Sequence, residues 1–592
     1  MKNFKLYSLF LILLLSSIVS CKKDFLDRLP KNLVSENIAY GSISGIEGLT
    51  TTLYNDIQTE DFNYTVADEG GYPSTITDEA VRSYVWGNIN DPIIGTSWMN
   101  SWDYDGIRRV NDFIEKLPGA KIDAPSIKRF LAEGRFIRAF EYFVKVKRYG
   151  GVPLIKSVQQ LTAGGDVNGL FVPRSKEQEV YDYIASELDA ASADLPEDYS
   201  NQPANKYRAT KYAALALKCR AMLYAASIAK YGSVQLNGLI GIPADQANSY
   251  WQKAMDAASL IINSNKYSLY DASADKAANF QKLFLTADNS EAILTQVYQS
   301  PDKTHSFDFY NAPQSFRVDY GNVICPTLEM VEEYEYTDGS PGTLKIKDTN
   351  GNPILYNKPA DIFKNKDPRM FASILTPFDS WQGGIVEIRR GVIDNGVKYT
   401  SENLTDTYGG TSFKIVGKDG PLTTWDPTKT GFYIKKFMDP VNRVPEHRST
   451  TPWMVFRYGE VLLNYAEAAF ELGNTAAALD GTNKIRTRAG IATLNTITLD
   501  KIRHERKVEL AFENHRYWDL RRWRIASTVL SNTQFHALYP WIMWQNGTDP
   551  SNMKYSFERA VAPKNTRTFP ENLNYQWLPQ QTPPYIQNPG YQ

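Results

Sequence analysis

Apolar residues recur at intervals of three and four along several stretches of the chain, which is the pattern of amphipathic α-helices. One face of the segment 124–149 carries Phe130, Phe136, Ile137, Phe140, Phe143 and Val144. Gly150-Gly151 and Pro153 end this helix, because glycine accepts the backbone conformation of a helix C-terminus and proline cannot extend a helix. The same kind of pattern predicts further helices over 175–195, 209–230 and 250–262.

The clearest helical pair lies late in the chain. Residues 455–472 and 475–488 each have an apolar face, and Gly473-Asn474 separates them. The pair spans 34 residues, the length of a tetratricopeptide unit. A further, charge-rich helix is predicted over 499–523. We therefore expect a mostly α fold built on a platform of tetratricopeptide-like helix pairs, without a strictly regular repeat.

Between residues 266 and 448 the helical spacing mostly disappears, and Gly, Asp, Asn, Pro and aromatic residues dominate. Two Asn-Gly dipeptides in this region lie between short apolar runs, and Asn-Gly supplies the positive φ angles of a type I′ turn. Two β-hairpins are therefore predicted, 344–347 with 354–356 and 392–393 with 397–399. A long, loop-rich insertion on a helical scaffold is a common place for binding function.

Composition narrows the possible functions. The 592 residues contain 65 Lys and Arg against 66 Asp and Glu, so there is no basic excess for neutralising nucleic-acid phosphates. Five His and three Cys argue against a multi-metal site, a zinc-finger array or a disulfide scaffold. The chain is instead rich in aromatic residues, with 36 Tyr, 27 Phe and 12 Trp, which can build both cores and flat contact surfaces.

The first residues have the pattern of an export signal. Lys2 and Lys5 precede an apolar run over 9–15 that is too short to span a bilayer. Ile-Val-Ser directly before Cys21 resembles a bacterial lipobox, which implies cleavage before Cys21 and acylation of its thiol. We therefore expect a signal peptide over 1–20 and a lipid-anchored tether over 21–30. The alternative is an ordinary secretory signal that happens to contain a cysteine.

Several later segments carry a family resemblance. In the first half of the chain they are 21–27 (CKKDFLD), 132–139 (AEGRFIRA) and 149–154 (YGGVPL). Further along they are 367–369 (DPR), 457–468 (RYGEVLLNYAEA), 485–490 (IRTRAG), 505–506 (ER), 509–513 (ELAFE), 516–523 (RYWDLRRW) and 587–591 (QNPGY). Their order across nearly the whole chain resembles the SusD/RagB family of outer-membrane nutrient-binding lipoproteins.

The resemblance implies a SusD-like domain over 31–592. Its expected parts are a helical platform over about 31–265 and 449–530, a loop-rich ligand-binding insertion over about 266–448 and an irregular C-terminal segment over 531–592. The implied function is non-catalytic and needs no cofactor. The protein would be lipid-anchored at the outer membrane, facing the cell exterior, and would pass captured oligosaccharide to a SusC-like TonB-dependent transporter. A peptide ligand is the alternative within the same family.

Three acidic residues suggest a different class of protein, an enzyme that hydrolyses its ligand. The predicted helix 499–523 places Glu505, Glu509 and Glu513 on one face, and a glycosidase needs two carboxylates in a cleft. Carboxylates stacked on one helix face repel one another unless cations intervene. Arginines do accompany them, at Arg503, Arg506 and Arg516. A structural ion network is therefore preferred over a surface glycosidase or peptidase.

Two aspartates in predicted loops, Asp338 and Asp348, could contribute oxygen ligands to a Ca²⁺ ion. The twelve-residue ligand pattern of a calcium loop is missing around both residues. Solvated turns are therefore the preferred interpretation, and a structural Ca²⁺ remains an open alternative.

Loop aromatics are the remaining candidates for ligand contact. The apolar face of a pyranose ring stacks on an aromatic ring, while its hydroxyls need polar partners, and exposed Tyr and Trp offer both. Two loop stretches, 72–98 and 307–320, combine aromatic with polar residues. The candidate residues are Tyr72, Tyr84, Trp86, Trp98, Tyr310, Phe316 and Tyr320. A purely structural tetratricopeptide scaffold, the last alternative, would have no such exposed aromatics.

Overall fold

The structure is a computed structural model that describes residues 36–64, 71–84, 95, 99–161, 165, 167, 170–424, 426–545, 553–564, 566–579 and 584–591. The predicted signal peptide and tether, with Cys21, lie outside these residues, as do Trp86 and Trp98. None of the helices in the described part of the chain combines the length and the apolar character that crossing a membrane requires.

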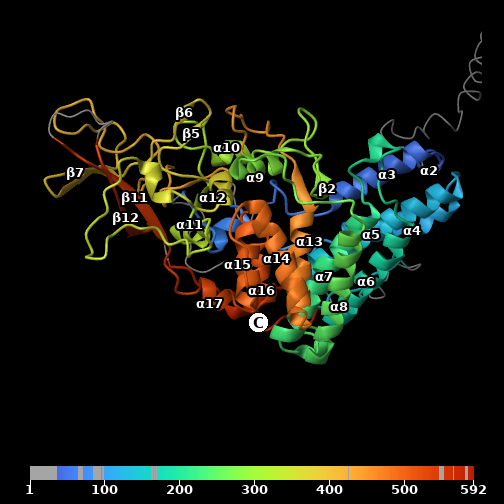
Figure 1. The fold of residues 1–592 in the computed structure, drawn as a ribbon. Coiled ribbons are helices and arrows are strands. Elements are labelled where there is room, and N and C mark those ends of the chain that lie inside the picture. The colour runs from blue at the N-terminus through green and yellow to red at the C-terminus, as the bar shows by residue number, and fades with distance from the viewer. Residues whose placement is uncertain are drawn as a thin grey trace, which may run out of the picture.

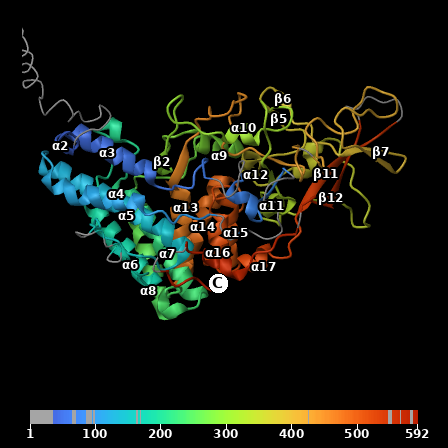
Figure 2. The ribbon, with the colours of Figure 1, turned by 180° about the vertical axis from the view of Figure 1, so that it is seen from behind.

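An array of helices forms one side of the molecule (Figures 1 and 2). Its members are α2 (Glu36–Ala39), α3 (Ile43–Asp56), α4 (Asp105–Lys116), α5 (Ala124–Tyr149), α6 (Glu177–Asp194), α7 (Lys211–Tyr231), α8 (Ala247–Asn263), α13 (Tyr458–Glu471), α14 (Thr475–Ala489) and α15 (Leu499–Glu509). Helices α5 to α8 pack in chain order, and α13 packs directly on α8 although residues 264–457 separate the two in sequence. The predicted mostly helical fold is confirmed.

Polar caps and glycines set the ends of these helices. The Asp123 carboxylate accepts a hydrogen bond from the Ser126 backbone N–H at 2.9 Å, which starts α5. Gly150 ends that helix with a φ of 73°. Between α13 and α14, Gly473 takes a φ of 82° and the Asn474 side chain caps the second helix. The local signals in the sequence therefore place these helix ends correctly.

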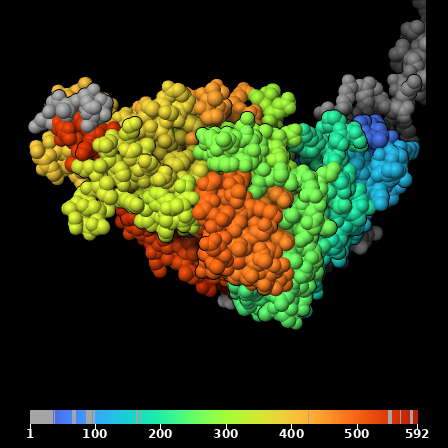
Figure 3. Space-filling model, in the orientation of Figure 1, coloured from blue at the N-terminus to red at the C-terminus, as the bar shows by residue number. Residues whose placement is uncertain are grey.

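The other side of the molecule is built mostly from the chain between α8 and α13 (Figure 3). Its elements are α9 (Lys276–Leu285), β2 (Ala292–Gln296), α10 (Phe307–Asn311), β3 (Ile324–Pro326), α11 (Leu328–Glu333), α12 (Pro368–Ser373), β4 (Ile374–Leu375), β5 (Ser380–Trp381), β6 (Gly384–Ile385), β7 (Gly391–Asp394), β8 (Val397–Thr400), β9 (Tyr433–Ile434) and β10 (Trp453–Arg457). Short antiparallel pairs join β2 to β10 and β4 to β9, and β3 pairs with the early strand β1 (Ala80–Arg82).

The two predicted hairpins have different outcomes. Strands β7 and β8 pair around Asn395 and Gly396, whose φ angles are 48° and 80°, so this hairpin is confirmed. In the other, Gly351 has a φ of 84° and the Ile354 N–H donates to the Ile346 carbonyl at 3.0 Å. The turn therefore forms where it was predicted, but the flanking residues make only an isolated bridge.

The β7–β8 hairpin belongs to a larger sheet in the order β12-β11-β7-β8. Strands β11 (His536–Met543) and β12 (Tyr555–Val561) come from the C-terminal segment that was expected to be irregular. The physical reason is the antiparallel pairing of β12 with β11, from His536 with Val561 to Ile542 with Tyr555, which buries Phe557. Both ribbon views place this sheet at the end of the molecule opposite α2, α3 and α4 (Figures 1 and 2).

Two predicted helices are shorter than the apolar pattern indicates. Residues 455–457 belong to β10, because Phe456 pairs with Leu294 of β2. The charge-rich helix 499–523 is broken after α15 and resumes as α16 (Arg516–Arg522), since Phe512 takes a φ of 63°. Helix α17 (Ala526–Leu530) then leads toward the sheet.

Candidate functional site

Four aromatic rings meet beside α10. Phe309 and Tyr310 belong to α10, Tyr320 to the loop before β3, and Tyr84 follows β1. The ring centroid of Tyr320 lies 5.8 Å from that of Phe309, 6.2 Å from that of Tyr310 and 6.4 Å from that of Tyr84. The antiparallel pairing of β1 with β3 brings the early segment to the middle one. We call these four residues the aromatic cluster.

The rings of the aromatic cluster differ sharply in exposure. Tyr320 is 45% exposed, whereas Tyr84 is 1% and Phe309 is 5% exposed. Tyr310 is half-buried, and its hydroxyl donates a hydrogen bond to the Glu446 carboxylate at 2.8 Å. Desolvation by burial raises the pKa of Tyr84 above its usual range. Tyr320 therefore presents an aromatic surface to solvent on a buried aromatic support.

Polar groups are carried by the same loop as Tyr320 and by the loop bound to it. Arg317 forms an ion pair with Asp426, and both side chains are partly exposed. The Asn322 side-chain amide donates to the Asp426 carbonyl at 2.7 Å, which holds the two loops together. Asp319, next to Tyr320 in the chain, is exposed. An aromatic face with a guanidinium and carboxylates nearby can stack a sugar ring and also hydrogen-bond its hydroxyls.

The seven aromatic residues predicted as ligand contacts fall into three groups: three lie together, two are buried apart from them, and two lie outside the described residues. Tyr84, Tyr310 and Tyr320 come together in the aromatic cluster. Tyr72 and Phe316 are 4% and 3% exposed, so neither ring offers a face to solvent. Tyr72 packs on Phe307 with the ring centroids 5.2 Å apart, and burial raises its pKa above the usual range. Trp86 and Trp98 lie outside the described residues.

Two polar neighbours of the cluster were not predicted from the sequence. Glu446 and Asp426 lie more than a hundred residues away in the chain from Tyr310 and Arg317, their partners. Each lies in a loop without helical or strand periodicity. No pattern along a single sequence reports contacts of that kind.

The three glutamates of the glycosidase hypothesis lie in a buried ion network. Arg369 donates to Glu505 at 2.6 Å and to Glu509 at 2.8 Å. Arg457 contacts Glu509 at 2.8 Å and Glu513 at 2.7 Å. All three carboxylates are buried. Glu513 lies beyond the end of α15, where Phe512 takes a φ of 63°, and it shares Arg457 with Glu509.

The electrostatics of this network differ from those of a catalytic acid. Burial alone would raise the pKa of Glu509, but Arg488, Arg457 and Arg369 outweigh that effect and hold the pKa well below its usual range. The pKa of Glu513 is likewise lowered, by Arg457 and Lys436. A glycosidase acid instead needs a raised pKa and access to the substrate. The geometry supports the structural interpretation of these carboxylates.

The two loop acids considered for calcium are engaged in turns. Asp338 accepts hydrogen bonds from the backbone N–H of Ser340 at 2.9 Å and from its hydroxyl at 2.6 Å. Asp348 accepts from the backbone N–H groups of Asn350 and Asn352, each at 2.9 Å. Within the described ranges, no group of three or more His, Cys, Asp or Glu residues is placed to hold a metal ion.

Comparisons with known proteins add to this geometry. Residues 290–591 match the model of the SusD family, and residues 24–223 match a model described as starch-binding associating with outer membrane. A SusD-like protein from Bacteroides ovatus is 23% identical over 532 residues, which cover 85% of this chain and 80% of that protein.

Solved structures share the fold. A SusD-like protein from Bacteroides fragilis superposes with a TM-score of 0.69 at 23% identity, covering 94% of this chain and 99% of that one. A SusD-like carbohydrate-binding protein from the same organism gives a TM-score of 0.63 at 22% identity, covering 91% and 97%.

Proposed function

The chain belongs to the SusD family, and from this premise we propose that it is a non-catalytic outer-membrane lipoprotein that captures oligosaccharide. In this proposal the bound glycan passes to a SusC-like TonB-dependent transporter for import. The description of the N-terminal family model, starch-binding associating with outer membrane, supports both the ligand class and the location. The solved relative described as carbohydrate-binding supports the ligand class as well.

The observation that carries the ligand class is the exposed ring of Tyr320 on its buried aromatic support. The buried rings of Phe309 and Tyr84 pack against that ring at an angle and favour a fixed position for it, which lowers the ordering cost of stacking a sugar. Arg317, Asp426 and Glu446 provide donors and acceptors for hydroxyl groups around it. We propose Tyr320 as the central contact and Tyr310 as its neighbour, and we keep Trp86 as a further contact predicted from the sequence alone.

The test compares Tyr320→Ala and Trp86→Ala with Tyr207→Ala, which removes a tyrosine of similar exposure, 39%, from a different surface. We expect calorimetry against a panel of neutral oligosaccharides to find a ligand. The two site variants should bind it at least about tenfold more weakly, a loss of about 1.4 kcal/mol, while Tyr207→Ala stays unchanged.

Other outcomes separate the rival hypotheses. Wild-type affinity in both site variants would remove these residues from the site. Binding of a peptide mixture but of no glycan would favour the peptide-binding alternative. Release of shorter products from a glycan by the purified protein would contradict the non-catalytic role.

The lipid anchor and the transporter need their own experiment, with tagged protein expressed in its native membrane. We expect palmitate labelling and recovery in the outer-membrane fraction for the wild type, and neither for Cys21→Ser. Mild detergent extraction of the wild type should retain a TonB-dependent transporter. Labelling of Cys21→Ser would contradict the anchor, and isolation without a transporter would contradict the partnership.

A further inference from the structure

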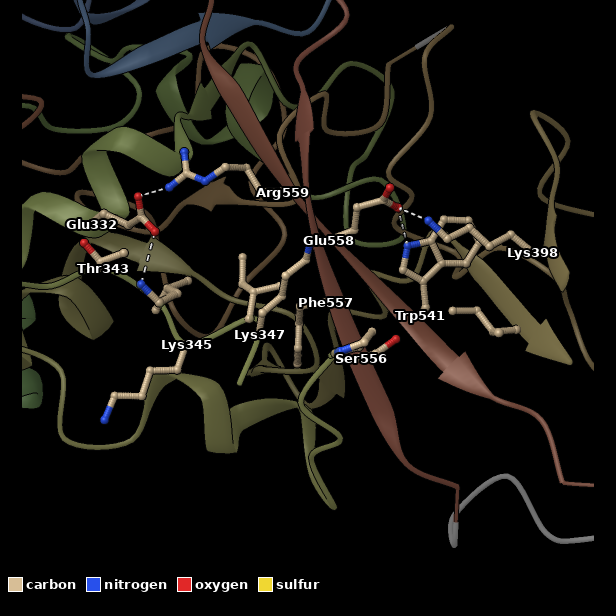
Figure 4. Close-up of a pocket in the computed structure, with 14 residues that line it drawn as sticks. Glu332, Thr343, Lys345, Lys347, Lys398, Trp541, Ser556, Phe557, Glu558 and Arg559 are labelled. Carbon is tan, nitrogen blue, oxygen red and sulfur yellow. Dashed lines mark hydrogen bonds and ion pairs between the residues drawn. The ribbon is translucent and has the colours of Figure 1, made fainter. Parts of the chain in front are cut away.

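A second candidate site lies at the far end of the molecule from the helical array. A pocket of about 900 Å³ opens between the segment 343–347 and the β12-β11-β7-β8 sheet (Figure 4). Its floor includes Ile346, Ile393 and the indole of Trp541. We call it the sheet pocket. None of the residues of the aromatic cluster lines it.

The indole of Trp541 is covered by a surface ion pair. The Lys398 ammonium lies 5.1 Å from the Trp541 ring centroid and 2.9 Å from the Glu558 carboxylate. The indole N–H donates to the same carboxylate at 3.0 Å. The Lys398 and Glu558 side chains are 48% and 39% exposed. Exposed ion pairs of this kind contribute little to stability, so Lys398 can leave the ring at small cost when another acidic group replaces Glu558.

The charges lining the sheet pocket do not balance. Its four cations are Lys345, Lys347, Lys398 and Arg559, and its two acids are Glu332 and Glu558. Arg559 pairs with Glu332, and Lys398 pairs with Glu558. In the described part of the chain, the ammonium groups of Lys345 and Lys347 form no hydrogen bond or ion pair, and both side chains are exposed. Figure 4 shows these two lysines across β12 from Lys398 and Trp541.

We propose that the sheet pocket binds an acidic oligosaccharide, one that carries carboxylate or sulfate groups. Its acid groups pair with Lys345, Lys347 and Lys398, and its sugar rings lie against the half-buried Ile346 and Ile393, since Trp541 itself is only 5% exposed. Charge complementarity selects an anionic ligand, and the volume is that of a typical ligand pocket, about 300–1,000 Å³. The glycan nature of the ligand rests on the proposed function. The site itself is additional to the aromatic cluster and differs from it in chemistry.

The test uses matched ligands and matched variants of the full-length protein. The carboxylate probe is hexagalacturonate, compared with its fully methyl-esterified form, which keeps the sugar chain and removes the charge. The sulfate probe is a heparin-derived hexasaccharide. The site variant is Lys345→Gln with Lys347→Gln. The control, Lys128→Gln with Lys253→Gln, removes two lysines from helices α5 and α8.

We expect the wild type to bind at least one acidic probe at low ionic strength, with an affinity that falls as NaCl rises past about 100 mM. Losing two charge-assisted contacts should weaken binding at least about tenfold in the site variant. The control pair should bind like the wild type, and the esterified hexamer should bind much more weakly. All variants should keep the wild-type thermal midpoint, because the substituted side chains are exposed.

Three results would overturn the proposal. They are no binding of either acidic probe, equal binding of charged and esterified hexamers, and an equal loss in the control pair. Preference for a glutamate hexapeptide over both acidic glycans would also contradict it. Tyr320→Ala should keep its affinity for the acidic probe. If no neutral oligosaccharide binds but an acidic probe does, the aromatic cluster is not a glycan site. The sheet pocket then remains supported as a site for acidic oligosaccharide.

Discussion

Asp78 and Glu79 are adjacent buried carboxylates whose pKa values are shifted in opposite directions by their surroundings. Asp78 contacts Arg516 at 2.7 Å and Lys507 at 2.9 Å. These cations outweigh desolvation and hold its pKa well below the usual range. Glu79 is 1% exposed and accepts a hydrogen bond from the Phe512 backbone N–H at 2.9 Å. Burial, with the charge of Asp78 adding to it, raises the pKa of Glu79 from 4.5 to about 7.

This raised pKa predicts a pH-dependent stability for the Glu79→Gln variant. The folded state keeps the Glu79 proton up to about pH 7, whereas the unfolded state releases it near pH 4.5. The wild type therefore loses stability relative to the variant as pH rises through this window. The difference should approach about 3 kcal/mol above pH 7, at about 1.36 kcal/mol per pKa unit. Urea unfolding at pH 4.5 and pH 8 measures it.

The exposed glutamate Glu571 provides the control for that experiment. Glu571→Gln should change the free energy of unfolding by the same small amount at both pH values. A Glu79→Gln difference that does not grow between pH 4.5 and pH 8 would show that Glu79 is ionised in the fold below neutral pH.

The aromatic candidates show what can be predicted at the scale of the residue. The sequence predicts ligand contacts in two loop stretches, 72–98 and 307–320, and Tyr310 and Tyr320 of the second stretch do lie together. It does not distinguish Tyr320, which is 45% exposed, from Tyr84, which is 1% exposed. The difference arises because the pairing of β1 with β3 brings Tyr84 against Tyr320 and buries Tyr84. Exposure of a loop residue depends on partners that are distant in sequence.

At the scale of the element, glycine conformations allow a paired prediction. Gly396 in the β7–β8 turn has a φ of 80°, and Gly48 lies inside α3. A Cβ atom added at either position meets no atom within 4 Å, so packing does not interfere. Alanine at 396 must adopt a left-handed conformation that costs about 1–2 kcal/mol. Alanine at 48 should instead stabilise its helix by about 0.5–1 kcal/mol.

Native-state hydrogen exchange reports both effects locally. Amides of β7 and β8 in Gly396→Ala should exchange at least about fivefold faster than in the wild type. Amides of α3 in Gly48→Ala should exchange more slowly. Unchanged exchange in the hairpin would mean that this turn does not limit its stability.

The elements also show where local patterns stop deciding the structure. Helix α5 has the bounds that its apolar spacing and flanking glycines predict, Ala124–Tyr149. The predicted helix 499–523 ends early at Glu509, although the residues that follow have good helical spacing. Phe512 and Asn514 take φ angles of 63° and 61° there, and Glu513 pairs with Arg457 and Lys436. The end of this helix is therefore not set by local apolar spacing.

The buried ion network connects the parts of the whole molecule. Arg457, at the end of β10, contacts Glu291 before β2, Glu509 at the end of α15, and Glu513. All four side chains are buried. Arg457→Met would leave three buried carboxylates short of a cation, and breaking a buried network in this way costs about 3–5 kcal/mol. We expect a loss of that size in the free energy of unfolding, measured with urea.

Lys484→Met is the matched control for this substitution. Lys484 forms an exposed pair with Asp480 at 2.7 Å on the neighbouring helix α14. Its removal should cost less than about 1 kcal/mol, because water solvates both groups when they are apart. Similar losses in the two variants would contradict the structural role assigned to the network.

The sequence by itself determined helices α5 to α8, α13 and α14, the two Asn-Gly turns and the ordered motifs that indicate the SusD family. These depend on backbone preferences and apolar spacing within a few residues, so they can be read locally. Only the tertiary structure decided which aromatic ring is exposed, that the C-terminal segment completes a sheet, and that the glutamates of the charge-rich helix are buried among arginines. Each of these depends on contacts between distant segments, where burial and charge pairing outweigh local preference.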